Sequence, residues 1–160
     1  MEPILTVATR NYGSVDEVRR DIGREIGVST WFHVTQDVVT AFAELTGDHE
    51  WIHVDVERAA AGPFGSTIAH GYLTLSLIPR FAAEVFRFDF DAATLNYGVE
   101  KVRFPTPLLT ESRVHARVSV TRVDEHAAGT AITFAYVLET EGGTKPACVA
   151  DTVLLVLGAT

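Results

Sequence analysis

The apolar positions in the first part of the chain recur at the spacing of helices. Within residues 14–26, three apolar residues fall on one helical face: Val15, Val18 and Ile22. Because Ser14 is a favourable N-cap, this pattern predicts a short helix. A second helix is expected after Thr35, with Gly47 at its end and with an apolar face made of Val38, Phe42 and Leu45. The intervening residues 29–34 are rich in β-favouring side chains and predict a strand.

The middle of the chain combines a loop with a strongly apolar stretch. Residues 57–61 predict one further helical turn, and the run Gly62-Pro63-Phe64-Gly65 predicts a loop. From residue 68 to residue 86 the side chains are apolar around most of a helix circumference, which is typical of a buried helix. Pro79 is expected to kink this helix or to tighten a turn near its middle, because proline lacks the backbone N–H of a helical hydrogen bond.

After Asp91 the apolar residues alternate with polar ones, as they do in strands. Four segments show this pattern, and turn-forming residues separate them: residues 94–104, 112–124, 130–140 and 147–157. Helices followed by a run of antiparallel strands predict an α+β fold in which a sheet wraps one buried helix. The chain has no internal repeat or linker, so we expect residues 1–160 to form a single domain.

Composition narrows the class of protein. The 160 residues are 47% apolar, enough for a core, and the formal charge of −8 has the wrong sign for a nucleic-acid or anionic-membrane binder. The sequence lacks an uninterrupted apolar stretch of about 18 residues, and Met1-Glu2-Pro3-Ile4 shows no signal segment. We therefore expect a soluble cytoplasmic protein. The single cysteine, Cys148, lies in an apolar run and is expected to be buried.

The densest polar segment contains the run His49-Glu50-Trp51-Ile52-His53, which matches the His-Glu-x-x-His pattern of zinc peptidases. That motif needs both histidines on one face of a helix. Gly47 ends the preceding helix before His49, and residues 52–56 alternate like an extended segment, which would point the two imidazoles apart. Ala59 also stands where one subclass needs its third ligand. These features argue against zinc, and we expect no metal.

Without zinc, Asp48 and His53 become a candidate acid–base pair. A carboxylate and an imidazole that converge on one water can act as base and acid near neutral pH. The sequence leaves an alternative open, in which Asp48 caps the next turn and His53 is a hydrogen-bonded core histidine.

The turn Ala69-His70-Gly71, at the entry to the apolar stretch, is a second candidate site. A backbone N–H of Gly71 at a helix N-terminus could donate a hydrogen bond to a developing oxyanion, and glycine lets a ligand approach closely. Ala69 and His70 are possible further substrate contacts. The alternative is a plain capping turn in which His70 caps the helix or packs.

Taken together, the run Phe42-Ala43-Glu44-Leu45-Thr46-Gly47-Asp48, the following His53 and the later Ile68-Ala69-His70-Gly71 resemble the MaoC-like R-specific enoyl-thioester hydratases of the hotdog fold. The resemblance covers most of the chain. Residues 35–46 look like the family's helix before the active-site loop, and residues 68–86 look like its long central helix. The late strands look like the antiparallel sheet that wraps that helix.

The resemblance implies an R-specific enoyl-CoA hydratase of fatty-acid metabolism, which adds water to trans-2-enoyl thioesters. It implies catalysis by Asp48 and His53, with the Gly71 amide on the thioester carbonyl. It implies no cofactor, since coenzyme A or acyl-carrier protein would carry the substrate, and it implies a homodimer or a higher hotdog assembly. Three alternatives stay open: a 3-hydroxyacyl-ACP dehydratase running the reverse reaction, a non-catalytic subunit that binds acyl thioesters, and a thioesterase.

The chain departs from the family's Gly-Asp-x-Asn-Pro-x-His loop, because Glu50 replaces the asparagine and Trp51 the proline. Glu50 could bring a further negative charge near Asp48. Trp51 is interpreted as a lid, a dimer contact or local packing. Four basic residues are candidates for binding coenzyme A phosphates: Arg58, Lys101, Arg103 and Arg113. The remaining histidines, His33, His115 and His126, show no partnering pattern and are assigned no function.

Overall fold

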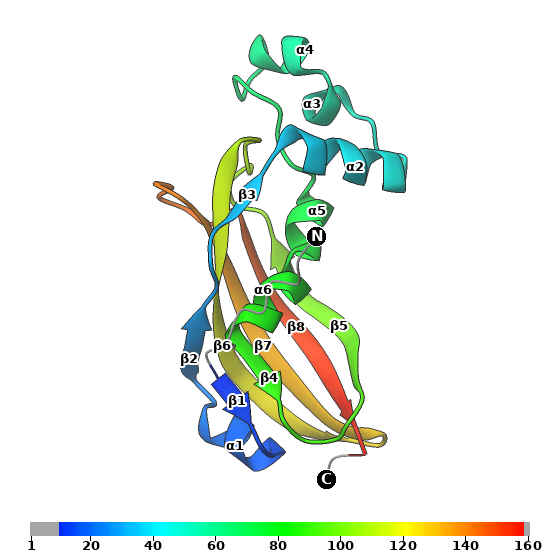
Figure 1. Cartoon of the computed structure of the whole chain (residues 1–160), viewed down its shortest axis with the longest axis vertical. Helices are drawn as coiled ribbons and strands as arrows, with labels where there is room; N and C mark the ends of the chain where they lie inside the picture. Colours follow the sequence, from blue (N-terminus) through cyan, green and yellow to red (C-terminus); the bar gives the residue numbers. More distant parts are fainter. Residues whose placement is uncertain (1–9, 159–160) are drawn as a thin grey trace.

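The computed structural model describes residues 10–158 (Figure 1). Its main element is a six-stranded antiparallel sheet with the strand order β2-β6-β7-β8-β5, in which the short β3 also pairs with β6. The strands are β2 (Arg24–Val28), β3 (Phe32–Val34), β5 (Thr94–Arg103), β6 (Ser112–His126), β7 (Gly129–Thr140) and β8 (Cys148–Leu157). Strands β5 to β8 confirm the four strand segments that the alternating pattern predicts.

Two helices, α5 (Gly71–Ser76) and α6 (Ile78–Val85), lie against one face of the curved sheet (Figure 1). The alternation in β6 turns every second side chain toward them, and these side chains are fully buried: Val114, Ala116, Val118 and Val120. From the helix side, Phe81 and Val85 complete the same core. Since each large buried apolar side chain contributes about 1.5–3 kcal/mol, this layer holds the helices on the sheet. The predicted α+β arrangement is confirmed.

The single buried helix predicted over residues 68–86 is wrong in its bounds, because the structure has two helices there. Leu77 ends α5, and Pro79 lies in the first turn of α6, where its missing N–H breaks no helical hydrogen bond. The first helix begins only at Gly71. Tyr72, predicted to be buried, is 74% exposed.

Helices α2 (Gln36–Thr46), α3 (Trp51–Val54) and α4 (Val56–Ala60) form a lobe beyond one end of the sheet, here called the α2–α4 lobe (Figure 1). As predicted, Thr35 caps α2 by accepting a hydrogen bond from the Val38 N–H, and Gly47 ends α2 with a φ of 75°. The prediction of an extended segment over residues 52–56 was wrong. The chain is helical there because the Asp55 side chain accepts a hydrogen bond at the start of α4 and the Asp55 backbone N–H donates to the Trp51 carbonyl oxygen at the end of α3.

The buried face of α2 differs from the predicted one. Leu45 is 83% exposed, whereas Val39 and Ala43 are fully buried and Val38 and Phe42 pack against the core. The helical period was therefore correct, but the packed face is rotated toward Val39, because α2 contacts the rest of the molecule along that side.

The N-terminal part contains helix α1 (Val15–Arg20) and two short parallel strands, β1 (Arg10–Tyr12) and β4 (Phe86–Phe88). Ser14 caps α1 as predicted, but the helix predicted over residues 14–26 ends early. Gly23, with a φ of 80°, turns the chain into β2, and Ile22 is exposed. The strand predicted over residues 29–34 is likewise limited to β3.

Two smaller expectations concern Cys148 and membrane segments. Cys148 is fully buried, as predicted, and burial raises the pKa of its thiol to about 11. Over residues 10–158, no helix has both the length and the apolar character needed to cross a membrane. Met1-Glu2-Pro3-Ile4, on which the expected lack of a signal segment rests, lies outside the described residues.

Candidate active site

His53, on α3, is held in a defined orientation. Its side chain is buried, and its Nδ1 lies 2.7 Å from the carbonyl oxygen of Ile68. A carbonyl oxygen only accepts hydrogen bonds, so Nδ1 carries the hydrogen, and a neutral ring then has its lone pair on Nε2. The geometry therefore leaves Nε2 as the nitrogen that can take up a proton.

The backbone around His53 is fixed by polar contacts from α2 and from the segment before α5. The side-chain amide of Gln36 donates to the His53 carbonyl oxygen at 2.8 Å, and the hydroxyl of Thr67 donates to the Gln36 side chain at 2.5 Å. The Ile68 N–H donates to the Ile52 carbonyl oxygen at 2.9 Å. These bonds tie the short helix α3 to two other parts of the chain. Gln36 and Thr67 were missed at the sequence level, because neither belongs to a motif.

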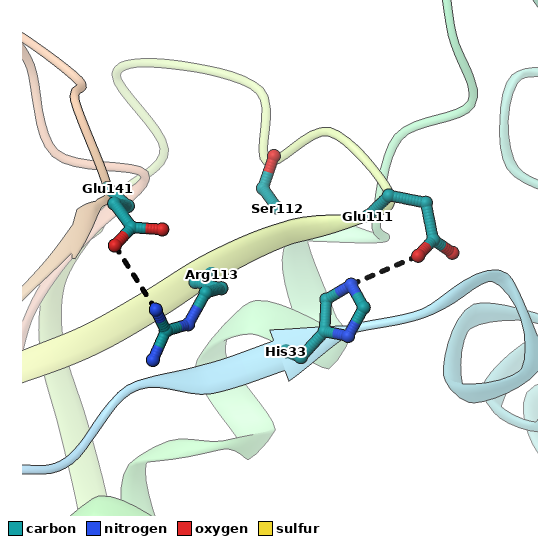
Figure 2. A pocket seen from close by; sticks show the side chains of 5 residues that line it. All are labelled: His33, Glu111, Ser112, Arg113 and Glu141. Atoms are coloured by element: carbon teal, nitrogen blue, oxygen red, sulfur yellow. Dashed lines mark hydrogen bonds and ion pairs between the residues drawn. The ribbon is translucent and has the colours of Figure 1, made fainter.

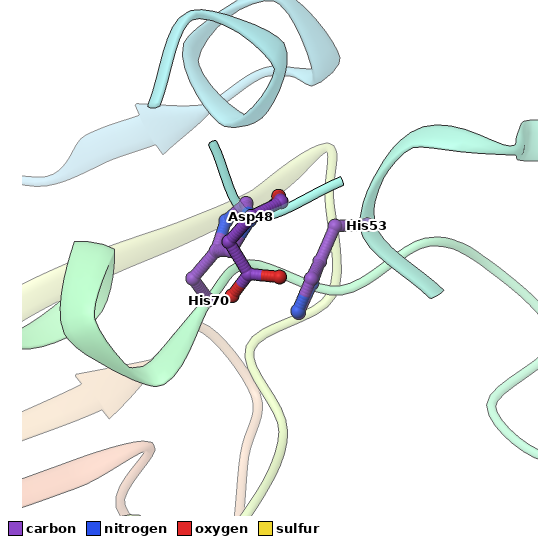
Figure 3. Close-up of side chains that lie close together, drawn as sticks. All are labelled: Asp48, His53 and His70. Atoms are coloured by element: carbon purple, nitrogen blue, oxygen red, sulfur yellow. The ribbon is translucent and has the colours of Figure 1, made fainter. Parts of the chain in front are cut away.

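Asp48 follows Gly47 in the exposed loop between α2 and α3, and its carboxylate faces His53 and His70 (Figure 3). One carboxylate oxygen of Asp48 and one ring nitrogen from each of the two histidines lie within 4.8 Å of one another. A water that makes two hydrogen bonds of about 2.8 Å can bridge such a span. The structure thus brings together the two residues predicted as an acid–base pair, no farther apart than one water can bridge.

His70 contacts both residues of this pair. Its ring stacks on the His53 ring with the centroids 3.8 Å apart, and its Nε2 lies 2.9 Å from the carbonyl oxygen of Asp48. Ala69 is also buried, and its N–H donates to the Leu108 carbonyl oxygen at 2.7 Å. Of these two possible substrate contacts, only Ala69 lines the adjoining cavity.

That cavity has a volume of about 230 Å³ and lies between the start of α5 and residues 104–108, with His53 of α3 in its wall. Its lining includes His53, Ala69, Gly71, Phe104 and Ala147. Gly71 is the first residue of α5, so the helix itself offers no carbonyl acceptor to the Gly71 N–H. A Cβ atom on Gly71 would lie 3.0 Å from the Phe104 ring, so only glycine fits without displacing that ring.

The zinc-peptidase pattern does not form a zinc-peptidase site. His49 lies before α3 and is exposed, and its Nε2 lies 3.0 Å from a carboxylate oxygen of Glu44. That contact raises the pKa of His49. Asp48, His53 and His70 do offer three potential ligand atoms, but the two rings are only 25° from parallel. Stacked imidazoles direct their in-plane lone pairs along different lines, which is poorly suited to sharing one ion.

Of the two departures from the family's loop, Trp51 has packing contacts, whereas the Glu50 side chain makes no capping hydrogen bond. Glu50 is exposed at the N-terminus of α3. The Trp51 ring packs under the Arg58 guanidinium, 4.2 Å from the ring centroid, and against Gly62, where a Cβ atom would lie 3.1 Å from the indole. Of the three interpretations of Trp51, the structure shows the local packing.

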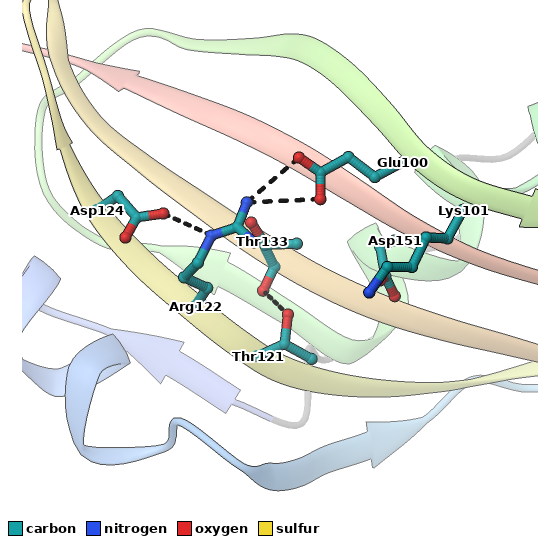
Figure 4. A network of polar contacts seen from close by, with 7 residues as sticks. All are labelled: Glu100, Lys101, Thr121, Arg122, Asp124, Thr133 and Asp151. Carbon is teal, nitrogen blue, oxygen red and sulfur yellow. Dashed lines mark hydrogen bonds and ion pairs between the residues drawn. The ribbon is translucent and has the colours of Figure 1, made fainter.

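Three of the four basic residues considered for phosphate binding have other partners. Arg58 covers Trp51, Lys101 pairs with Asp151 at 3.8 Å, and Arg113 pairs with Glu141 at 3.2 Å. The pair of Lys101 belongs to an exposed charged network on the outer sheet face, centred on Arg122 (Figure 4). Arg103 contacts its neighbour's carbonyl oxygen and directly precedes Phe104 of the cavity lining.

An open hollow of about 530 Å³ lies elsewhere, over β3 and β6 (Figure 2). Its ionic side chains are already paired, since His33 lies 3.0 Å from Glu111 and Arg113 pairs with Glu141. The other two histidines without an assigned function also have structural contacts. His115 stacks on Trp31, and His126 meets Tyr97 edge to face.

The fold is that of a hotdog protein, and comparisons with known proteins place it in a family. Residues 17–141 match the family described as MaoC like domain. The chain therefore belongs to the MaoC-like family. It is 46% identical over 146 residues to 3-hydroxyacyl-thioester dehydratase Z of Mycobacterium tuberculosis, a match that covers 91% of this chain and 97% of the relative.

Solved structures agree on the fold. The chain superposes on a monoamine oxidase regulatory protein from Archaeoglobus with a TM-score of 0.75 and 24% identity, covering 94% of this chain and 99% of the other. The R-hydratase PhaJ1 from Pseudomonas aeruginosa gives a TM-score of 0.68 and 20% identity, with 84% and 82% covered. Together with the family match and the dehydratase relative, this makes the chain a hydro-lyase with a hotdog fold.

Proposed function

We propose that the chain is an R-specific hydratase of trans-2-enoyl thioesters. The oxygen of one water bonds to C3 of the substrate, and one proton is added at C2, which gives an R-3-hydroxyacyl thioester. Dehydration is the same path in reverse, and the 46% identical dehydratase supports this class of substrate. The observation that carries the proposal is the placement of the Asp48 carboxylate and a His53 ring nitrogen within 4.8 Å of each other.

In the proposed mechanism, Asp48 and His53 hold the attacking water between them. The His53 Nδ1–H remains on the Ile68 carbonyl oxygen, so Nε2 is available to the water. The pair takes a proton from the water as its oxygen bonds to C3, and it returns a proton to C2. The bond from Gln36 to the His53 carbonyl supports this role, because it limits the movement of the imidazole.

Gly71 is proposed to bind the thioester carbonyl. Its N–H is at the first position of α5, and the residue lines the same cavity as His53. The carbonyl oxygen, which becomes negatively charged during attack at C3, would accept this hydrogen bond. Ala69 lies beside it in the cavity wall.

A second cavity offers space for the acyl chain. It measures about 190 Å³, lies between the two central helices and the sheet, and is lined mainly by apolar side chains that include Leu75, Pro79, Ala82 and Leu154. Thr74 lines the first cavity and Leu75 the second, so consecutive residues of α5 border both. We propose that the reacting end of the substrate occupies the first cavity and the acyl tail the second.

We propose that residues 1–160 act as one catalytic unit and that two copies form a homodimer. Strand β5 is at an edge of the sheet and carries three exposed apolar side chains, Leu95, Tyr97 and Val99. An edge strand has one side without a partner strand, and when it also carries exposed apolar side chains it is a common site of association. Light scattering of the purified chain would give a mass of twice 17.4 kDa for a homodimer, and a monomer mass would contradict it.

We propose that the reaction needs neither a metal nor another cofactor. The support is the near-parallel stacking of His53 and His70, which is poorly suited to sharing an ion. Dialysis against a chelator should leave turnover unchanged, and restoration of lost turnover by zinc would contradict the proposal.

The test is an assay of the purified chain with trans-2-enoyl thioesters of increasing length, each offered on coenzyme A and on acyl-carrier protein. A hydratase removes the enone absorbance without releasing thiol, whereas a thioesterase releases thiol. Faster loss of water from R-3-hydroxyacyl-carrier protein than hydration of enoyl-CoA would favour a dehydratase. Binding without any turnover would show a non-catalytic subunit and would overturn the proposal.

A further inference from the structure

His70 is next to both proposed catalytic residues, yet it does not line the cavity. Its side chain is 2% exposed, with the His53 ring 3.8 Å away on one side and the Phe42 ring at 5.1 Å. A ring enclosed in this way offers no surface to a substrate. Its function must therefore be exerted through the residues that it touches.

The hydrogen bonds of His70 show where its proton lies. Nε2 lies 2.9 Å from the carbonyl oxygen of Asp48, and because a carbonyl only accepts, Nε2 must be the donor. Nδ1 is buried, with no hydrogen-bond partner within residues 10–158. The contacts therefore fit a neutral ring with its hydrogen on Nε2. Leaving a buried nitrogen unpartnered is unfavourable, so a phenyl ring would suit this position better if packing alone mattered.

This bond ties the Asp48 peptide to the start of α5, whereas other contacts of its loop, such as that between His49 and Glu44, lead back to α2. Residues 47–50 are all exposed, and the contact from the Glu50 N–H to the Asp48 carboxylate is long, at 3.5 Å. His70 in turn is well fixed, since its carbonyl oxygen accepts from the Thr74 N–H at 3.0 Å and from the Thr74 hydroxyl at 3.1 Å. The rigid start of α5 thus holds an otherwise exposed loop.

We propose that His70 is a positioning residue. Through its Nε2–H it fixes the backbone of Asp48, and through its ring face it fixes the His53 imidazole, so that carboxylate and imidazole share one water. This inference rests on the proposed function of Asp48 and His53. His70 itself contacts no reacting atom.

Two substitutions separate the two contacts. His70→Phe keeps a ring on His53 but loses the donor to Asp48, and His70→Gln keeps a donor but loses the ring. Misplacing a catalytic group by about 1 Å can lower a rate about 100-fold, so we expect kcat of His70→Phe to fall about 10- to 100-fold with KM nearly unchanged. His70→Gln should recover part of that loss.

His115→Phe is a matched control, because His115 also stacks on an aromatic ring, that of Trp31 at 3.9 Å, and contacts a carboxylate, that of Glu139 at 3.2 Å. It should keep the kcat of the wild type. In an Asp48→Asn background, His70→Phe should cause little further loss, since its effect passes through Asp48. An equal fold-loss in both backgrounds, or wild-type kcat for His70→Phe, would overturn the positioning role.

A measurement on the unmodified protein covers the case in which a variant does not fold. Nitrogen-15 NMR of the histidine rings should find the hydrogen of His70 on Nε2 and a bare Nδ1. A hydrogen on Nδ1 would overturn the inference whatever the activity assays give. If Asp48→Asn keeps full turnover while the NMR result holds, the proposed function fails and the contact geometry stands.

Discussion

The sheet and the α2–α4 lobe are held together by different interactions. Strands β6 and β7 share a long antiparallel ladder, and their inward side chains, such as Val118 and Phe134, are buried among apolar neighbours. Helix α3 is a single turn, and its position depends on the hydrogen bond that His53 accepts from Gln36 and on the one that its ring donates to the Ile68 carbonyl oxygen. Apolar burial thus builds the sheet, whereas a few hydrogen bonds orient the proposed catalytic groups.

This difference predicts that changes in the sheet core lower stability, whereas changes around α3 and α5 lower activity. The largest effect on stability is expected for Phe134→Ala. Phe134 is buried and stacks on Phe86 with the centroids 4.4 Å apart, so the cavity should lower the free energy of unfolding by about 3–5 kcal/mol. Urea unfolding measures this loss.

The control is Val56→Ala, which changes an exposed side chain and should shift stability by no more than about 0.5 kcal/mol. The kcat of the folded fraction of Phe134→Ala should match the wild type. A stable Phe134→Ala protein with low kcat would show that the sheet, too, orients the site.

Gly71→Ala should have the next largest effect. The new methyl group would lie 3.0 Å from the Phe104 ring, so either the ring or the start of α5 must move away from the proposed carbonyl site. We expect kcat/KM to fall about 100-fold, similar to the loss of one oxyanion donor. Gly13→Ala, where the added Cβ has an ordinary contact of 3.6 Å, should change nothing. If a second change, Phe104→Leu, does not restore activity, crowding by the ring is the wrong explanation.

Gln36→Leu should have a smaller effect on activity. It removes the donor to the His53 carbonyl and the acceptor of the Thr67 hydroxyl, with little change in volume. We expect kcat to fall about 10-fold through a small displacement of His53, and stability to fall by about 1–2 kcal/mol. Circular dichroism on heating and steady-state kinetics would measure both. Unchanged kcat with the same loss of stability would mean that Gln36 supports the fold alone.

The smallest effect concerns the buried thiol. Burial raises the pKa of Cys148 from 9.0 to about 11, so the thiol should not react with a disulfide reagent at pH 8 until the chain unfolds. Because the folded chain holds this proton more tightly, the associated stability is present below pH 9 and is lost as the pH rises toward 11. Rapid labelling of the folded chain would contradict the burial of Cys148.

Strands β5 to β8 of the sheet were predicted well because their signals are local. Alternation such as that of Val114, Ala116 and Val118 reports directly which side of a strand is buried. The predictions from sequence failed where an unrecognised cap or a contact with a distant part of the chain determines the local structure. Residues 52–56 alternate like a strand, but the Asp55 cap makes them helical. The short strands β1 and β4 are formed by pairing with each other across the chain, which no local period reveals.

The site was predictable in part. Asp48 and His53 stood in one short segment, and the Gly71 turn was recognisable from its helix-start position and from the family resemblance. Gln36 and Thr67 were not, because a glutamine after an N-cap and an isolated threonine are common in any sequence. The position of His70 between Asp48 and His53 also depends on the packing of α5 against the lobe, which only the three-dimensional structure gives.

The most direct test of the central claim, that Asp48 and His53 act on one water, is a double-mutant cycle of enone hydration with Asp48→Asn and His53→Gln. Each single variant should lower kcat by about 100- to 10,000-fold. The double variant should be no slower than the slower single, since both changes disable the same step. Wild-type turnover in either folded single variant, or losses that multiply in the double variant, would contradict a shared water.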